Sequence, residues 1–408
     1  MSEQDVAERR AAIVVNEPNR WRLETPGAPG WKYSARPGAP NKLLMISADC
    51  HANEPASLWA ERIDPKYRDR LPRIWIDEHG VQWRKSEGYE KADRINLAAL
   101  EGEDQVRSKA GADPLDRLRD DDLDGIDGEV IFPNKGLAMW ATPDPVFAQA
   151  QCRVYNDWAW EQFGPHIDRL SPAAALATGD IEGTMTEIER VAKLGFRHVT
   201  LPSKPLFGPH SVGELNYNKV EFDPIWAALQ DHDLAATFHV STGKDPRSAR
   251  GLGGAVINYV VHSLAPTIEP LVHICSSGVA ERFPKLRFGT IETGIGWLAW
   301  MLDAMDEAYL KHHFWVRPKL KALPSDYFRA NGFASFGEDK PGLDLIEKHN
   351  LVDNVLWAND YPHHEGTWPH SAEAIERNFK DLSEETRIRV LGRNAAKIFR
   401  FPMPARLD

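Results

Sequence analysis

Cysteine is scarce in this sequence, since only 3 of its 408 residues are cysteines and no two of them lie close together. A chain with so few cysteines offers neither a disulfide framework nor a thiolate zinc site. Any metal ion would have to be held by histidines and carboxylates. Those ligands suit zinc, iron or manganese.

Long apolar runs are also missing, and none approaches the roughly 18 uncharged residues that a membrane span needs. The N-terminal segment carries charges and shows no signal-peptide pattern. We expect no membrane association, and we take the cytoplasm as the default compartment.

Positive charge is in deficit, with a formal net charge of -11 and no stripe of Lys and Arg along the chain. This composition argues against a nucleic-acid partner. No Gly-rich phosphate loop directly follows a predicted strand, which argues against a dinucleotide cofactor. We therefore expect a small-molecule substrate.

Short apolar runs alternate with amphipathic segments from Lys42 onward, as expected of parallel strands covered by helices. The runs that qualify as strands are 43–49, 128–133, 172–178, 197–202, 235–240, 286–292, 333–336 and 354–360. This pattern suits a closed barrel better than an open doubly wound sheet. The sequence predicts an α/β fold, a distorted (β/α)8 TIM barrel over residues 41–408 that follows an extended arm over residues 1–40.

Two insertions interrupt the predicted barrel, over residues 52 to about 113 after the first strand and 241 to about 270 after the fifth. Both leave the carboxyl ends of strands, where barrel active sites are built, so we expect them to form walls or a lid. The Pro-rich arm should wrap the body or a neighbouring subunit. Together with the apolar, Trp-containing segment 297–310, it suggests a homodimer.

Metal-ligand residue types stand at the ends of several predicted strands. Asp49 and His51 end the first strand, where alternation puts both on one face. The fifth, sixth and eighth strands carry His239, Glu292 and Asp360. Each residue alone could be a helix cap or a packing residue. Because strand ends converge in a barrel, their joint occurrence predicts a shared metal site.

The segments SADCHANEP, FHVSTG, GVAERFPKLRFGTIETGIGW, WANDYPH and NAAKIF give the sequence a family resemblance. From about Lys42 to Phe399 it resembles the amidohydrolase-related family, which includes aminocarboxymuconate semialdehyde decarboxylase. The resemblance implies metal ligands from the first strand, from His239 and from Asp360. It also implies that Asp360 orients or deprotonates a metal-bound water.

Two departures from that family make the predicted site more acidic. This chain has Asp49-x-His51 on the first strand, where the decarboxylases often have His-x-His or Glu-x-His. It has Glu292-Thr293-Gly294 after the sixth strand, where many members have His-Gly-Gly. Glu292 could bridge a second cation, so we expect one or two divalent ions per subunit.

Several further residues surround the predicted metal site. Glu54 could fix the His51 imidazole or simply cap the insertion, and His363 could bind substrate or a second metal and take part in catalysis. Lys204 stands where binuclear amidohydrolases use a carbamylated lysine, but it could equally be a loop charge. Cys50 should point away from the barrel axis.

Three functions remain open on these residues. Hydrolysis, with a metal-activated water attacking an ester, thioester or amide carbonyl, is favoured by the acidic ligand set, with Asp360, His239 and His363 as catalytic residues. The alternative is non-oxidative decarboxylation of an aromatic or dienoic carboxylate, for which Arg247 and Arg250 are candidate carboxylate-binding groups. A barrel without catalysis, kept as a scaffold, fits poorly with an intact ligand set.

Overall fold

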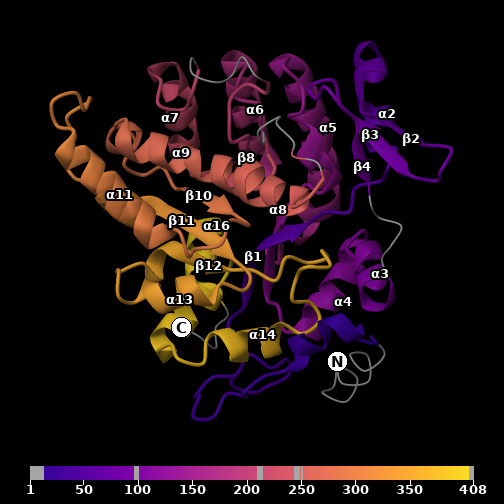
Figure 1. Ribbon diagram of the computed structural model, residues 1–408, viewed down its shortest axis with the longest axis vertical. Coiled ribbons are helices and arrows are strands. Elements are labelled where there is room, and N and C mark those ends of the chain that lie inside the picture. The colour runs from indigo at the N-terminus through magenta and orange to yellow at the C-terminus, as the bar shows by residue number, and fades with distance from the viewer. Residues whose placement is uncertain (1–12, 96–100, 209–214, 243–248, 250, 404–408) are drawn as a thin grey trace.

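A ring of parallel strands forms the centre of the molecule, with helices around it (Figure 1). The computed structural model describes residues 13–95, 101–208, 215–242, 249 and 251–403. The barrel strands are β1 (Ile46–His51), β5 (Gly128–Phe132), β6 (Leu170–Pro172), β7 (Ala174–Ala175), β8 (His198–Leu201), β9 (Ala235–His239), β10 (Phe288–Ile291), β11 (Gly332–Phe336) and β12 (Val355–Trp357).

These strands pair in the orders β1-β5-β6 and β12-β11-β10-β9-β8-β7, and all neighbours are parallel. The two sheets meet at two seams. The first seam is the predicted strand 172–178, which forms two short strands in the structure. Pro172 has no amide hydrogen to continue the ladder. β6 therefore pairs with β5, β7 pairs with β8, and Ala173 donates to the carbonyl of Ile131 at 2.8 Å between them.

The second seam lies between β1 and the segment after β12. A parallel bridge joins Cys50 to Tyr361, and the amide of Asp360 donates to the carbonyl of Asp49 at 3.1 Å. With both seams joined, the fold is a distorted (β/α)8 barrel, as the sequence predicts. The eighth strand ends at Trp357, so Asp360 lies in a turn beyond it and not in the strand that we expected.

The barrel interior is filled by apolar side chains from alternate strand positions, including Val130, Phe132, Ile291, Phe333 and Leu356. This core fills the barrel below the strand ends, so the space for a small molecule lies at its mouth.

Helices cover the outside of the barrel. They are α4 (Pro114–Asp124), α5 (Pro145–Phe163), α6 (Ile181–Leu194), α7 (Asp223–Asp231), α9 (Ala265–Ser276), α10 (Val279–Arg282), α11 (Leu298–Lys311), α12 (Pro324–Asn331), α13 (Lys340–Ile346), α14 (Ser371–Asn378), α15 (Glu384–Ile388) and α16 (Asn394–Phe399). Asp113, Asp144 and Asp180 cap α4, α5 and α6, because their carboxylates accept first-turn amides. No described helix is long and apolar enough to cross a bilayer.

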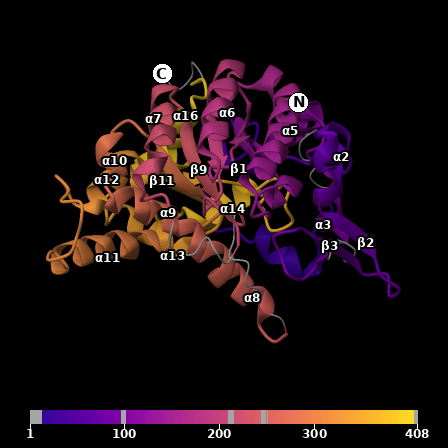
Figure 2. The ribbon, with the colours of Figure 1, turned by 90° about the horizontal axis from the view of Figure 1, so that it is seen from above.

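Both insertions have structure of their own. The first contains α2 (Leu58–Arg62), an antiparallel sheet of β2 (Arg73–Ile76), β3 (Gln82–Lys85) and β4 (Asp93–Ile95), and α3 (Gly102–Lys109). The second contains α8 (Gly254–Tyr259) and a π-helical turn, η8 (Val260–Leu264), which runs on into α9. Figure 2 shows α8 projecting away from the barrel. Arg247 and Arg250 lie outside the described residues.

The described part of the N-terminal arm lies against its own chain. It contains a short helix, η1 (Glu17–Leu23), that contacts α14. Arg36 donates to the Glu376 carboxylate of α14 at 2.6 and 2.9 Å. The arm therefore wraps the body, one of the two arrangements that the sequence suggests.

Candidate metal centre

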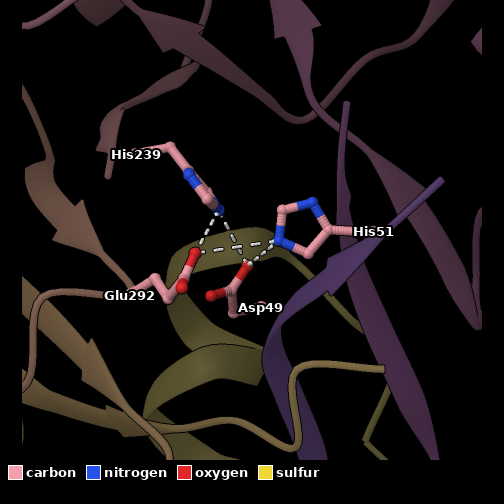
Figure 3. A group of neighbouring side chains, drawn as sticks. All are labelled: Asp49, His51, His239 and Glu292. Atoms are coloured by element: carbon pink, nitrogen blue, oxygen red, sulfur yellow. Dashed lines mark hydrogen bonds and ion pairs between the residues drawn. The ribbon is translucent and has the colours of Figure 1, made fainter. Parts of the chain in front are cut away.

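Four side chains from three strand ends at the barrel mouth converge at one point (Figure 3). Asp49 and His51 come from β1, His239 ends β9, and Glu292 follows β10 by one residue. Each offers one ligand atom, and these atoms all lie within 4.8 Å of one another. His239 Nε2 lies 3.2 Å from Asp49 Oδ1 and 3.5 Å from Glu292 Oε2.

The hydrogen bonds of the two histidines decide which nitrogen faces the group. His51 Nδ1 lies 3.0 Å from the Pro133 carbonyl, and His239 Nδ1 lies 2.8 Å from the Val240 carbonyl. A carbonyl only accepts, so each Nδ1 carries a hydrogen and each Nε2 is the nitrogen that faces the group, where the neutral ring offers a lone pair. This is the tautomer that a metal-binding histidine needs.

The lone pair of His51 Nε2 has no hydrogen-bond donor among the described residues, although the atom is buried. It lies 3.7 Å from Asp49 Oδ1 and 3.9 Å from Glu292 Oε2. Burial and the neighbouring His363 and His239 hold the pKa of His51 well below 6.5, so the imidazole is neutral. Lone pairs and carboxylate oxygens that face one another at these distances fit a divalent cation between them.

Asp360 and His363 form a second pair beside these four side chains. Asp360 Oδ1 lies 3.4 Å from His51 Nε2 and 3.1 Å from His363 Nδ1. The His363 ring stacks on the His51 ring at 3.9 Å. The structure thus brings together all five sequence-predicted ligand candidates, with His363 against them.

Crowded carboxylates raise one another's pKa at this site. Burial, followed by the charges of Asp360 and Asp49, raises the pKa of Glu292 well above 4.5. Burial raises the pKa of Asp360 to about 6, although His363 opposes the shift. Burial disfavours the His363 imidazolium, yet the Asp360 and Glu365 carboxylates outweigh it and raise its pKa to about 9. Without a bound cation, the site therefore holds protons.

Backbone strain marks the two carboxylates that lie beyond strand ends. Glu292 has φ of 59° and Asp360 has φ of 53°, the left-handed region that side-chain-bearing residues rarely adopt. This conformation costs on the order of 1–3 kcal/mol and persists where the surroundings enforce it, as at functional sites. Strand periodicity does not reveal such turns, which explains why the eighth strand was predicted too long.

Arg117 of α4 contacts the backbone of a ligand candidate from outside the barrel mouth. This residue was not identified from the sequence. Its buried guanidinium donates to the His51 carbonyl at 2.8 Å and pairs with Glu129. It also lies 4.8 Å from the centre of the Tyr361 ring. An arginine in a helix rich in acidic residues looks like a surface residue in sequence, so no signal pointed to it.

Two other predicted residues have different roles in the structure. The Glu54 carboxylate accepts the amides of Asn134 at 2.9 Å and Lys135 at 3.0 Å, so it fixes the loop after β5 rather than the His51 imidazole. The loop in turn carries the Pro133 carbonyl that orients His51. Lys204 Nζ lies 3.8 Å from the Glu269 carboxylate of α9, which is not one of the ligand candidates, so in the structure Lys204 pairs as a loop charge.

A cavity of about 340 Å³ opens beside the ligand group. Its walls include Asp49, Tyr259, Glu292, Phe336, Asp360 and Glu365. None of the described residues that line it is Lys or Arg. Tyr259 comes from the second insertion, which therefore does contribute a wall, and sequence reasoning gave no signal for this residue.

Ligand residues at the carboxyl ends of barrel strands, beside a cavity for a small molecule, define a metal-dependent barrel enzyme. A model of the family described as Amidohydrolase matches residues 48–401, so the chain belongs to the amidohydrolase family. This confirms the resemblance seen in the sequence. None of the curated proteins matches the chain.

Solved structures share the fold at low sequence identity. An amidohydrolase from Mycobacterium avium subsp. paratuberculosis K-10 is 19% identical, with a TM-score of 0.69, over 88% of this chain and 100% of that one. The 5-carboxyvanillate decarboxylase LigW from Sphingomonas paucimobilis is 20% identical, with a TM-score of 0.63, over 88% of this chain and 100% of that one. A dihydroxybenzoic acid decarboxylase from Polaromonas sp. JS666, solved with bound manganese and the inhibitor 2-nitroresorcinol, is 20% identical. Its TM-score is 0.59, over 90% of this chain and 99% of that one.

Proposed function

We propose that this protein is a metal-dependent, non-oxidative decarboxylase of a hydroxylated aromatic carboxylate. The observation that carries the proposal is the Asp360 carboxyl group, which pairs with His363 at 3.1 Å and lies 3.4 Å from His51 Nε2. It places a proton donor at the rim of the ligand group. The similar folds of two aromatic-acid decarboxylases support this reaction over hydrolysis, which the sequence favoured.

Asp49, His51, His239 and Glu292 would hold the ion, and their mixed nitrogen and oxygen donors suit manganese, zinc or iron. A bound ion would supply a Lewis acid for the carboxylate and an adjacent hydroxyl group of the substrate, and it would stabilise negative charge on the ring. The manganese of the Polaromonas structure makes manganese the first metal to test.

Asp360 delivers the proton that decarboxylation consumes, after His363, whose pKa is raised to about 9, has passed its own proton to the Asp360 carboxylate. Its carboxyl proton forms the new C–H bond at the ring carbon that bears the carboxylate. The C–C bond then breaks, its electron pair returns to the ring, and carbon dioxide leaves. His363 pairs with Asp360 at 3.1 Å and stacks on the His51 ring, and it takes a new proton from solvent after each turnover.

Hydrolysis is the second candidate, because a further acidic group could hold another ion. Glu292, Asp360 and Glu365 also bring ligand atoms within 4.8 Å of one another. Two ions bridged by carboxylates suit activation of water. The same Asp360 would then act as a base instead of an acid.

The test is to incubate the manganese-loaded protein with panels of hydroxybenzoates, aryl esters and thioesters, and to measure carbon dioxide and acid release. We expect carbon dioxide from a hydroxybenzoate. Asp360→Asn should lower its kcat by about 10²- to 10⁴-fold, since an amide cannot deliver the proton.

The matched control is Asp381→Asn, which removes an exposed carboxylate away from the cavity, and it should keep full activity. Acid release from an ester without any carbon dioxide would establish hydrolysis and reject decarboxylation.

A further inference from the structure

Two arginines from separate segments converge on the loop that carries His363. Arg22 belongs to η1 of the N-terminal arm, and Arg107 belongs to α3 of the first insertion. Both donate to the carbonyls of His364 and Gly366, which lie one and three residues beyond His363. Segments far apart in the sequence thus bind one active-site loop.

The contacts are shared between the two guanidinium groups. The His364 carbonyl accepts from Arg22 Nη2 at 3.0 Å and from Arg107 Nη1 at 3.1 Å. The Gly366 carbonyl accepts from Arg107 Nη1 at 2.6 Å and also from Arg22 Nη1. Charge-assisted hydrogen bonds of this kind are about twice as strong as neutral ones.

Neighbouring carboxylates and amides make this pair of like charges tolerable. Arg107 is fully buried, and its pKa is lowered by burial and by Arg22. The Glu103 carboxylate lies 3.3 Å from Arg107 Nη2 and also accepts from Asn19 of the arm at 2.8 Å. Asn16 donates to Asp104 at 3.1 Å. The arm and α3 therefore form one unit around the two charges.

The loop itself has little room to move. A Cβ at Gly366 would lie 2.4 Å from the carbonyl oxygen of Asn359, so only glycine fits there. The Gly366 amide donates to the His363 carbonyl at 3.1 Å, and the Thr367 amide donates to Asn359 at 2.9 Å. Glu365, Gly366 and Thr367 line the cavity. The arginines thus act on the loop that presents both His363 and a cavity wall.

We propose that Arg22 and Arg107 are positioning residues, which hold the 363–366 loop so that His363 stays against Asp360, and that the N-terminal arm is therefore part of the active site. The proposal deepens the proposed function and rests on it. The arginines do not touch the four metal-ligand candidates, so they should act on turnover and not on metal binding.

The test compares Arg22→Gln with Arg20→Gln in the manganese-loaded protein. Arg20 lies in the same helix η1, but its side chain is 70% exposed and pairs with Glu17 of that helix. We expect Arg22→Gln to lower kcat about 10- to 100-fold, since small displacements of catalytic groups have effects of this size. KM and manganese affinity should change less than about 3-fold. Arg22→Lys should restore part of kcat, and Arg20→Gln should match the wild type.

A double-mutant cycle separates positioning from general destabilisation. In a His363→Ala background, Arg22→Gln should cause no further loss of kcat, because the group that it positions is gone. Amide hydrogen exchange of residues 363 and 366–367, measured without substrate, should be faster in Arg22→Gln than in Arg20→Gln. Arg107→Gln should behave like Arg22→Gln where the buried change still permits folding.

Equal kcat values for Arg22→Gln and Arg20→Gln, or an undiminished loss in the His363→Ala background, would overturn the proposal. A parallel loss of manganese affinity would do the same. If the wild type releases no carbon dioxide from any hydroxybenzoate, the proposed function fails. The exchange comparison then still decides whether the arm holds the loop.

Discussion

At the scale of single residues, the imidazole of His239 is expected to be essential for metal binding. His239→Ala removes a ring nitrogen that the Val240 carbonyl orients toward Asp49 and Glu292. We expect manganese affinity to fall by more than the 10- to 100-fold typical of losing a group that only supports a ligand. Isothermal titration calorimetry measures this. His273→Ala, which removes a histidine paired with Glu269 on α9, should bind manganese like the wild type.

The ligand candidates could be read from the sequence because each one stands at or just beyond the end of a barrel strand. Asp49, His51, His239, Glu292 and Asp360 needed only the barrel hypothesis to be brought together. Arg117 and Tyr259 could not be found in this way. They reach the site from a helix and from an insertion, where no periodicity reports on the distance to the barrel mouth.

The His363–Asp360 pair predicts a pH dependence of stability. The Asp360 carboxylate raises the pKa of His363 to about 9, above the value of 6.5 expected in the unfolded chain. Its stabilising contribution is therefore fully present below pH 6.5 and is lost as the pH rises through 9. In the metal-free protein, the difference in Tm between the wild type and His363→Gln should shrink from pH 6 to pH 9.5. A difference that grows with pH would contradict this assignment.

At the scale of elements, sequence patterns located the strands well and their ends less well. The run 172–178 is broken at Pro172, and the last strand stops three residues before Asp360. In both cases local backbone chemistry ends the ladder, through a missing amide hydrogen or a left-handed turn. The π-helical turn η8 was not predicted, because its apolar residues continue the pattern of an ordinary helix.

Tyr259, the last residue of α8, and Leu264, the last residue of that π-helical turn, both line the cavity. Burial and the charges of Glu292 and Asp360 raise the pKa of Tyr259 to about 12, so its hydroxyl keeps its proton at neutral pH. We expect this hydroxyl to donate to an anionic substrate oxygen, since no described Lys or Arg lines the cavity.

Tyr259→Phe should raise KM about 10- to 100-fold, the effect of losing one hydrogen bond to a charged group. Steady-state kinetics on a hydroxybenzoate that the wild type decarboxylates, as the proposed function requires, test this, with Val256→Ala as the control. Val256 lies on the same helix, 68% exposed and outside the cavity wall. Equal KM values for the two variants would remove Tyr259 from the substrate site.

At the scale of the whole molecule, binding of the metal should be coupled to folding. Asp49, His51, His239 and Glu292 come from three strands far apart in the sequence, so an ion that binds them favours only the folded chain. A ligand at 100 times its Kd stabilises by about 2.7 kcal/mol. Removing the metal with a chelator should therefore lower Tm, and returning manganese should restore it.

The rise in Tm that manganese causes should be larger at pH 7.5 than at pH 5, because of the carboxylates at the site. Glu292 and Asp360 have raised pKa values, Asp360 to about 6, so near pH 5 the metal-free site holds protons in place of a cation. From pH 5 to pH 7.5 the Asp360 proton leaves, and the metal-free protein loses stability because the Asp360 carboxylate repels the carboxylates around it. At the higher pH fewer protons compete with the ion for the carboxylates, and the ion neutralises more of the repulsion between them. Differential scanning calorimetry with and without manganese should show a larger increment at pH 7.5 than at pH 5. The Glu292→Gln variant should show a smaller rise, because one of the repelling charges is absent.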